Sequence, residues 1–194
     1  MAFLIPGTVH TLDQAEVINI RDIFQSMFMA GDLALRQVAE LTGLATYDIQ
    51  NWVKRGFLAP PQRKRYNLDQ VCRILNINTL RTVLPMETIC GLLSYINGQL
   101  ADNCDDIIRD SELYFIFVDL AASVGKMVQH PDELEDWLAD ALADYEEPFE
   151  GAKERIEEVL KIMLTAWAAA QLRQHAENMV KQLPIKKEND YGNF

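Results

Sequence analysis

Two glycines, Gly43 and Gly56, each end a short stretch in which apolar residues recur at helical spacing. The first stretch begins at Leu35, and the second runs from about Thr46 to Arg55. Glycine readily adopts the left-handed backbone conformation that ends many helices. The pattern therefore predicts two short helices joined by a tight turn at Gly43, a helix-turn-helix unit. The residues expected to face inward are Leu35, Val38, Ala39, Leu41, Ile49, Trp52 and Val53.

A loop rich in proline and positive charge follows the second predicted helix. Pro60 and Pro61 disfavour a helix and favour an extended course. The run Arg63–Tyr66 then supplies three consecutive cations and a tyrosine. We therefore expect a short basic wing beside the helix pair.

Helical spacing of apolar residues covers most of the remaining chain, apart from a loose lead-in over residues 1–10. A first helix is expected from Leu12 to Gly31. The dense apolar stretch Leu113–Val118 fits either a strand or a buried helix, and the apolar residues that follow it favour a helix. The other helices are expected to begin at Asn67 or Asp69, at Pro85, near Asp102, at Pro131 and at Ala152.

These elements predict an all-α fold in three parts. Residues 1–31 form an N-terminal helix that packs on the core, and residues 32–98 form the winged helix-turn-helix unit with its short wing. Residues 99–194 form an acidic helical domain for dimerisation or effector sensing. The chain has 194 residues, of which 49% are hydrophobic, and this is enough to bury a core.

The net charge of −11 hides a strong asymmetry along the chain. Between Ala34 and Arg81, eight basic residues stand against three acidic ones, so this window carries +5. The rest of the chain has ten basic and 26 acidic residues, or −16. A positive island in an acidic chain is typical of a surface that binds phosphate, so the window indicates nucleic-acid binding.

The second predicted helix carries side chains that suit the major groove of double-stranded DNA. The amides of Gln50 and Asn51 can pair with adenine, while Thr46 and Tyr47 can reach bases or phosphates. Cations at the end of this helix and on the wing would contact phosphates or enter the minor groove. The residues therefore favour a DNA-binding protein.

The run Leu35–Leu44 resembles the opening of the MerR-type (mercury-resistance-regulator-like) winged helix-turn-helix. Met86–Leu93 is similar to the fourth helix of that family, and the resemblance covers about a third of the chain. The whole chain also resembles a bacterial family of unknown function that is built on this DNA-binding unit. The other residues that carry the MerR-type resemblance are Ile49, Trp52, Gly56, Phe57, Leu58, Pro60, Pro61, Arg65 and Tyr66.

The MerR-type resemblance implies a transcriptional regulator that binds a near-palindromic promoter as a homodimer, with its second helix in the major groove. Trp52 stands where the family has a phosphate-contacting tyrosine, and Arg65 matches an arginine of the family's wing. Gln50 departs from the family, which has an arginine at this place. The full set of residues expected on DNA is Arg36, Thr46, Tyr47, Gln50, Asn51, Trp52, Lys54, Arg55, Arg63, Lys64, Arg65 and Tyr66.

Two other features of the family are not expected here. The long dimerisation helix that follows the family's fourth helix is not evident after Gly98, and the cysteines lack metal-sensing spacing. Dimerisation then depends on the predicted helix 152–183, for which a place in the core of one chain is an equal alternative. Residues at a stride of roughly 3.5 mark one face of that helix. They are Ile156, Leu160, Met163, Trp167, Ala170 and His175.

No catalytic constellation occurs, so we expect no enzyme and assign no catalytic residue, cofactor or metal. His10, His130 and His175 are scattered, and the chain has no nucleophile elbow, zinc-protease motif or glycine-rich phosphate loop. Two alternatives to DNA binding remain: an adaptor that binds proteins through both halves, and an enzyme-like domain in the carboxyl half that binds a small molecule. Aromatic and methionine residues either line an effector pocket or fill the core. They are Tyr114, Phe115, Phe117, Met127, Trp137, Met163 and Trp167.

Cysteine use and hydropathy favour a cytoplasmic protein. Cys72, Cys90 and Cys104 form no C-x-x-C pair, which indicates reduced and mostly buried thiols. No apolar run is long enough to span a bilayer, so no membrane partner is expected. The segment Met1–His10 has neither the basic region nor the cleavage site of an export signal.

Overall fold

Helices make up most of this structure, as the spacing of apolar residues predicts. The computed structural model describes residues 2–13, 20–98, 106–125 and 130–183. In chain order its elements are β1 (Ala2–Leu4), β2 (Thr11–Asp13), α1 (Ile20–Phe28), β3 (Leu33–Ala34), α2 (Leu35–Thr42), α3 (Thr46–Lys54), β4 (Arg65–Tyr66), α4 (Leu68–Leu80), α5 (Met86–Asn97), α6 (Asp110–Ala121), the 3-10 helix η2 (Pro131–Glu133), α8 (Leu134–Ala141) and α9 (Ala152–Gln182).

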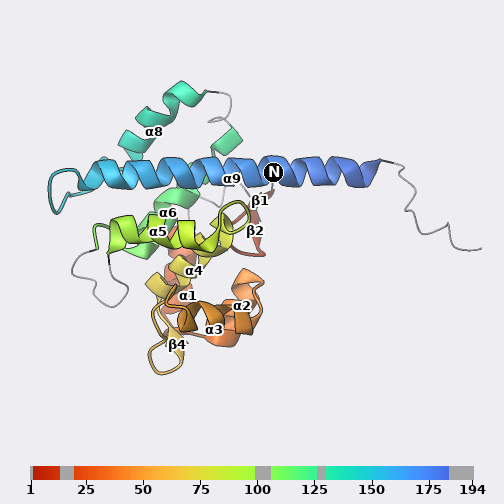
Figure 1. Cartoon of the computed structure of the whole chain (residues 1–194), viewed down its shortest axis with the longest axis vertical. Coiled ribbons are helices and arrows are strands. Elements are labelled where there is room, and N and C mark those ends of the chain that lie inside the picture. Colours follow the sequence, from red (N-terminus) through yellow and green to blue (C-terminus); the bar gives the residue numbers. More distant parts are fainter. Residues whose placement is uncertain (1, 14–19, 99–105, 126–129, 184–194) are drawn as a thin grey trace, which may run out of the picture.

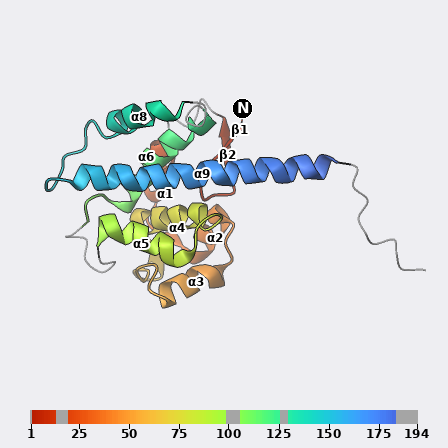
Figure 2. The same ribbon diagram turned by 45° about the horizontal axis from the view of Figure 1, so that its top comes forward.

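The long helix α9 lies across the molecule and divides it into two sides (Figure 1). Helices α4, α5 and α6 pack against α9. Helix α8 lies on one side of α9, while α2, α3 and β4 form the opposite end of the molecule (Figures 1 and 2). One hydrophobic core connects these layers from α1 to α9.

The N-terminal residues form a hairpin, so the expected loose lead-in was wrong. β1 pairs with β2 in an antiparallel manner. The turn between the two strands is held by distant elements: the Tyr114 hydroxyl donates to the Pro6 carbonyl over 2.8 Å, and the Val9 amide donates to the Leu41 carbonyl over 3.2 Å. Because these partners come from α6 and α2, no local pattern near the N-terminus indicates the hairpin.

Helix α1 begins at Ile20, later than the predicted start at Leu12, because Leu12 belongs to β2. Residues 14–19 lie outside the described part of the chain. Phe24 of α1 packs against two aromatic rings of α6, with centroid separations of 5.6 and 5.9 Å. The N-terminal helix therefore packs on the core, as expected.

The two short helices predicted on either side of Gly43 are confirmed. The Gly43 residue that ends α2 has a φ of 70°, and its amide donates to the Ala39 carbonyl over 2.9 Å. Helix α3 ends just before Gly56, whose φ is 76°. β3 pairs in an antiparallel manner with β4, with Leu33 opposite Tyr66. This pairing joins the start of α2 to the end of the proline-rich loop.

Helix α4 lies at the centre and packs against α1, α2, α5, α6 and α9. Asn67 caps it: the Asn67 side chain accepts from the Gln70 amide over 2.9 Å, and the Gln70 side chain accepts from the Asn67 amide over 3.1 Å. Asp69, the alternative cap, has another role. It accepts hydrogen bonds from the amide and the hydroxyl of Ser111 over 3.2 and 2.5 Å, and so links α4 to α6.

The ambiguous apolar stretch Leu113–Val118 lies within α6 and is helical. Helix α5 lies between Pro85 and Gly98, as predicted. The aromatic and methionine residues of the acidic part mostly fill the core, and Met127 lies outside the described residues. The buried ones are Tyr114, Phe115, Phe117, Met163 and Trp167.

Helix α9 is buried along its first half and exposed along its second. Gly151, with a φ of 88°, precedes it at the predicted break. Of the residues at a stride of roughly 3.5, those from Ile156 to Ala170 are buried in the core of the chain, and His175 is exposed. The alternative of a place in the core of one chain therefore holds for the first half of this face, while the end of α9 projects beyond the body (Figure 2).

The cysteine thiols were expected to be mostly buried, and the structure agrees in part. Cys72 is fully buried, and burial raises the pKa of its thiol. Cys90 is partly buried, and Cys104 lies outside the described residues. Within the described ranges, no helix combines the length and the hydropathy that a membrane crossing requires.

Candidate nucleic-acid interface

Helix α3 turns one polar face to solvent and buries the other. Ile49 and Trp52 lie in the core beneath it. Apolar residues at this spacing leave the intervening polar residues on the opposite side of a helix. Five residues predicted to contact DNA therefore share one exposed face. They are Thr46, Tyr47, Gln50, Asn51 and Lys54.

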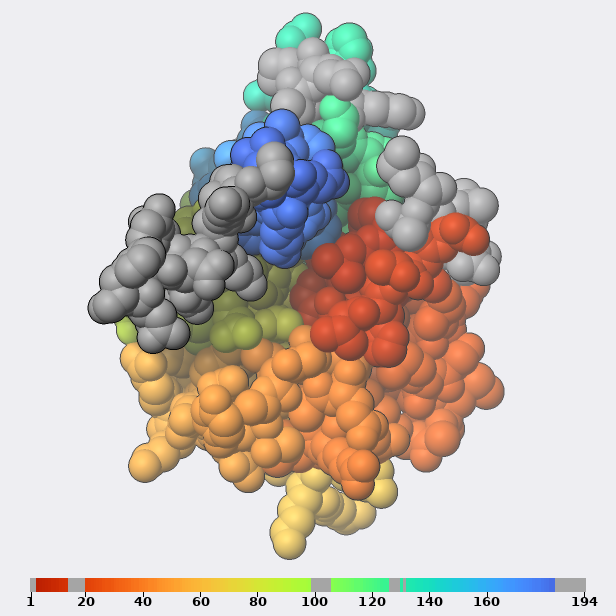
Figure 3. Space-filling view, turned by 90° about the vertical axis from the view of Figure 1, so that its right-hand side faces the viewer, coloured from red at the N-terminus to blue at the C-terminus, as the bar shows by residue number. Residues whose placement is uncertain are grey.

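The loop after α3 ends in a tight turn over residues 62–65, which we call the basic turn. The Arg65 amide donates to the Gln62 carbonyl over 2.8 Å. Between them, Arg63 and Lys64 have φ angles of 49° and 65°. Two successive left-handed residues are typical of a type I′ hairpin turn. Figure 3 shows this part of the chain, in yellow, projecting beyond the orange helices of the same end of the molecule.

The residues at the tip of the basic turn are not those that the backbone favours. Left-handed backbone costs a residue with a Cβ atom about 1 kcal/mol or more, which is why such turns are usually Asn-Gly. Arg63 and Lys64 are both exposed, and neither takes part in an ion pair within the described residues. Strain of this kind is concentrated at functional sites. The turn therefore presents two uncompensated cations to solvent in a conformation that glycine would adopt more easily.

The other cations of the predicted interface are held by neighbouring groups. Arg65 donates through Nη1 to the Asp32 carbonyl over 2.7 Å, which braces the pairing of β3 with β4. Arg55 pairs with Glu87 at 3.0 Å, and Arg36 pairs with an acidic residue one turn along α2. Exposed pairs of this kind are weak. Arg36 and Arg55 thus remain available to a phosphate, while Arg65 has a structural role.

Two aromatic residues expected on DNA are core residues. Trp52 is 7% exposed and Tyr66 is 3% exposed. Trp52 shares the inner face of α3 with Ile49, and burial raises the pKa of the Tyr66 hydroxyl. Both side chains position the elements that carry them, and neither is exposed enough to contact DNA.

Arg73 also belongs to the core and not to the positive surface. It is 4% exposed, its Nη1 lies 3.3 Å from the Asp110 carboxylate, and its Nε lies 3.3 Å from the Phe57 carbonyl. Burial raises the pKa of Asp110, and the charge of Arg73 opposes that shift. The positive window between Ala34 and Arg81 therefore has one surface charge fewer than its sequence indicates.

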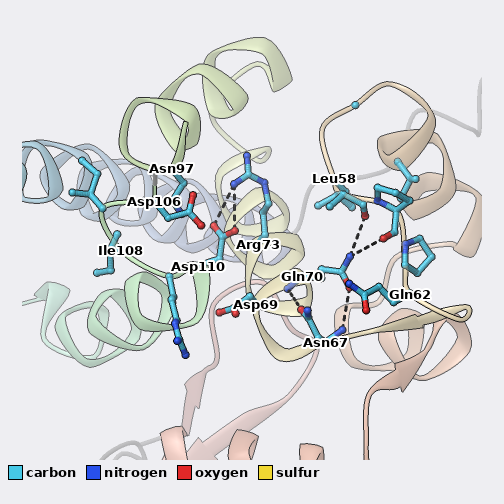
Figure 4. A pocket seen from close by; sticks show the side chains of 17 residues that line it. Leu58, Gln62, Asn67, Asp69, Gln70, Arg73, Asn97, Asp106, Ile108 and Asp110 are labelled. Atoms are coloured by element: carbon cyan, nitrogen blue, oxygen red, sulfur yellow. Dashed lines mark hydrogen bonds and ion pairs between the residues drawn. The ribbon is translucent and has the colours of Figure 1, made fainter. Parts of the chain in front are cut away.

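A cleft of about 1280 Å³ opens between the proline-rich loop and the segment that leads into α6 (Figure 4). On the loop side, the Gln70 side chain donates to the carbonyls of Ala59 and Pro60 over 3.2 and 3.1 Å. Arg73 lies on the other side of the cleft (Figure 4). Helix α4 thus anchors both the loop of the basic turn and α6. Sequence analysis missed Gln70, although its spacing from Asn67 is typical of a capping box.

A smaller cleft of about 490 Å³ separates α3 from the basic turn. Gln50 lines it from α3, and Lys64 lines it from the turn. The polar face of α3 and the tip of the turn are therefore two neighbouring ridges with a groove between them. The remaining lining residues are Leu35, Val53, Pro61 and Tyr66.

Comparison with known proteins assigns the chain to a family. The family described as "Domain of unknown function (DUF1836)" matches residues 19–117, about half of the chain. This chain belongs to the DUF1836 family. The match runs from α1 into α6, so it contains α3, the basic turn and the Arg73–Asp110 pair. The expected membership of a family of unknown function is thus confirmed.

A relative of this DUF1836 protein is "Uncharacterized protein YkrK" of Bacillus subtilis (strain 168), which is 29% identical over 102 residues. The match covers 50% of this chain and 42% of that protein, so the chain matches less than half of its relative's length. No solved structure matches this chain.

Proposed function

We propose that this chain is a DNA-binding transcriptional regulator with a MerR-like winged helix-turn-helix. In this proposal α2 and α3 are the helix pair, the basic turn is the tip of the wing, and a dimer binds a near-palindromic promoter. The observation that carries it is the basic turn, because Arg63 and Lys64 are held in left-handed conformation beside the exposed polar face of α3.

Helix α3 would enter the major groove, whose width admits an α-helix. The amides of Gln50 and Asn51 can form paired hydrogen bonds with adenine, and Lys54 can reach the phosphate backbone. Arg63 and Lys64 lie across the smaller protein cleft from α3. They would neutralise phosphates of the DNA backbone beside the groove that α3 enters. Base reading is therefore assigned to α3, and sequence-independent affinity to the turn.

The acidic residues at the starts of α8 and α9 are remote from the proposed DNA surface. Helix α8 and the first turns of α9 lie on the side of the body away from α3 (Figure 1). Their first turns contain Glu135, Asp136 and Glu154. Salt screens charges over about 8 Å at physiological ionic strength. These three charges therefore weigh little at the surface of α3.

Selection from a random pool of duplex oligonucleotides tests the proposal. At low salt the full chain is expected to enrich a near-palindromic sequence, and the logarithm of its affinity falls with the logarithm of salt by about 0.9 per phosphate contacted. A pool that remains random, with no salt-sensitive binding to duplex, would overturn the proposal.

Two variants of α3 separate base reading from phosphate binding. Gln50→Ala is expected to weaken binding to the selected sequence by about 1–3 kcal/mol and to leave binding to a random duplex nearly unchanged. Lys54→Ala is expected to weaken all duplexes alike and to reduce the salt slope by about 1. Both side chains are exposed, so unchanged thermal unfolding serves as the control for folding. Equal losses of Gln50→Ala on both duplexes contradict base reading by this residue.

A further inference from the structure

Helix α9 carries a second apolar stripe on the face opposite its buried residues. Its members are separated alternately by three and four residues, the spacing of a coiled-coil seam. Four of them are large and apolar: Ile162 is 45% exposed, Leu172 is 60% exposed, and Met179 and Leu183 are each 56% exposed. We call this set the outer stripe, and it comprises Ile162, Thr165, Ala169, Leu172, Ala176, Met179 and Leu183.

The end of α9 extends beyond the rest of the molecule. Figures 1 and 2 both show this part of the helix projecting from the body. All side chains from Leu172 to Leu183 are exposed. A helical segment as short as this projecting end is only marginally stable in water unless an apolar face of it is packed. The exposed leucine and methionine side chains of the projecting end therefore fit a partner.

The outer stripe suits a second copy of itself because it contains no charged residue. The charges of the projecting end lie off the stripe, and Arg173 pairs with Glu177 of the same helix at 3.6 Å. Lys161, beside the anchored end of the stripe, pairs with Glu135 of α8 at 3.1 Å. Two copies can thus approach along this face without burying an unpaired charge.

We propose that the outer stripe of α9, from Thr165 to Leu183, binds the same segment of a second copy of the chain in antiparallel orientation. This deepens the proposed function, on whose dimer it rests, by naming the contact surface. An antiparallel pair whose two-fold axis passes near residue 174 sets large side chains against small ones. Leu172 then faces the partner's Ala176, Met179 faces the partner's Ala169, and Leu183 faces the partner's Thr165.

A parallel pair fits less well, because each residue would face its own copy. Ala169 and Ala176 would then leave gaps, while Leu172 and Met179 would meet equally large side chains, and close packing disfavours both. The antiparallel segment from Thr165 onward is about 28 Å long at 1.5 Å per residue. It buries on the order of 1,000 Å², at the lower end of specific interfaces, so the dimer is expected to dissociate on dilution.

Sedimentation equilibrium of the full chain tests the contact. At high concentration the mass is expected to be near twice the 22.1 kDa of one chain. Leu172→Glu with Met179→Glu is expected to give one-chain mass at the same concentration. Because dissociation removes the stabilisation that a partner supplies, the unfolding temperatures of the variant and the unmodified chain are compared at a dilution where both are monomeric, and they should agree there. A monomeric unmodified chain, or a variant that remains dimeric, would overturn the proposal.

A control variant adds the same charge to the same segment off the stripe. Gln174→Glu with Asn178→Glu is expected to remain dimeric. If this control also gives one-chain mass, added charge alone explains the effect, and the outer stripe is not the contact. Circular dichroism of both variants checks that α9 stays helical.

Disulfide crosslinking tests the orientation. A mixture of Ala169→Cys and Met179→Cys chains is expected to form a disulfide between residues 169 and 179 of different chains, identified by mass spectrometry of the joined peptides. Met179→Cys alone is not expected to crosslink to itself. Self-crosslinking of Met179→Cys without the mixed product would overturn the antiparallel arrangement.

The dimer and the DNA proposal fail separately. If the chain dimerises through the outer stripe but binds no duplex, the proposed interface stands and the proposed DNA-binding function is overturned. If the chain binds a single half-site of the selected sequence but stays monomeric, the proposed DNA binding stands and the proposed interface is overturned.

Discussion

The guanidinium of Arg73 and the carboxylate of Asp110 meet at the wall of the larger cleft, nearly buried, with Nη1 3.3 Å from Oδ2. Arg73 comes from α4, and Asp110 is the first residue of α6. Through Nε the same guanidinium donates to the carbonyl of Phe57, where the proline-rich loop begins. One buried cation therefore holds the loop of the basic turn and the acidic half of the chain in a defined relation.

Asp110→Ala is expected to lower the free energy of unfolding by about 1–3 kcal/mol, because it leaves the buried Arg73 guanidinium without the carboxyl oxygens that accept its hydrogen bonds. Urea unfolding of the full chain measures the loss. Replacing both partners, as Arg73→Met with Asp110→Leu, should recover most of it, since an apolar pair needs no desolvated charge. A loss below about 1 kcal/mol for the single variant would show that the pair is not effectively buried.

Asp110 also makes the free energy of unfolding depend on pH, in the direction opposite to that of most carboxylates. Burial raises the pKa of this carboxyl above its ordinary value of 3.8, and the charge of Arg73 opposes that shift. The folded state therefore binds this proton more tightly than the unfolded state. The contribution of Asp110 to the free energy of unfolding rises as the pH falls through the raised pKa, and it levels off below 3.8.

Asp110→Asn isolates this effect, because asparagine takes up no proton. The difference in unfolding free energy, unmodified chain minus variant, is expected to increase between about pH 7 and pH 4 in urea titrations. A difference that stays constant or decreases over this range would show that the pKa of Asp110 is not raised.

Lys64→Gly is expected to change stability and DNA binding in opposite directions. Glycine removes the Cβ atom that strains the left-handed backbone, so the free energy of unfolding should rise by up to about 1 kcal/mol. The lost charge should weaken duplex binding and reduce the salt slope by about 0.9. Thermal unfolding and fluorescence anisotropy measure the two effects on one sample.

Lys64→Ala is the matched control, because it removes the charge and keeps the Cβ atom. It should weaken duplex binding as much as Lys64→Gly and bring no gain in stability. If both variants bind duplex like the unmodified chain, the basic turn does not contact DNA.

Gly7→Ala is expected to destabilise the fold much more than Gly56→Ala, although both glycines have a φ of 76°. A Cβ atom on Gly7 would collide with the Leu75 carbonyl oxygen, whereas one on Gly56 would meet nothing within 4 Å. Gly56→Ala should therefore cost only the left-handed penalty of about 1–2 kcal/mol. Equal midpoints in urea would mean that the N-terminal hairpin does not pack on α4.

Local signals were sufficient for the helix pair, and for the polar face that the candidate interface uses. The conformations of Gly43 and Gly56 and the inward spacing of Ile49 and Trp52 depend on residues within one or two helical turns. The positions of α2 and α3 could therefore be predicted from the chain alone. The cap at Asn67 was likewise one of two local alternatives, and only its bond with Gln70 distinguished them.

Long-range packing decided the rest, because it depends on residues far apart in the chain. Nothing near Arg63 and Lys64 signals a left-handed turn, whose ends are set by the pairing of β3 with β4. The burial of Arg73 and Tyr66 likewise required partners from other elements. The same spacing gives α9 two apolar stripes, and only its place across the body shows which one is buried and which one is left for a partner.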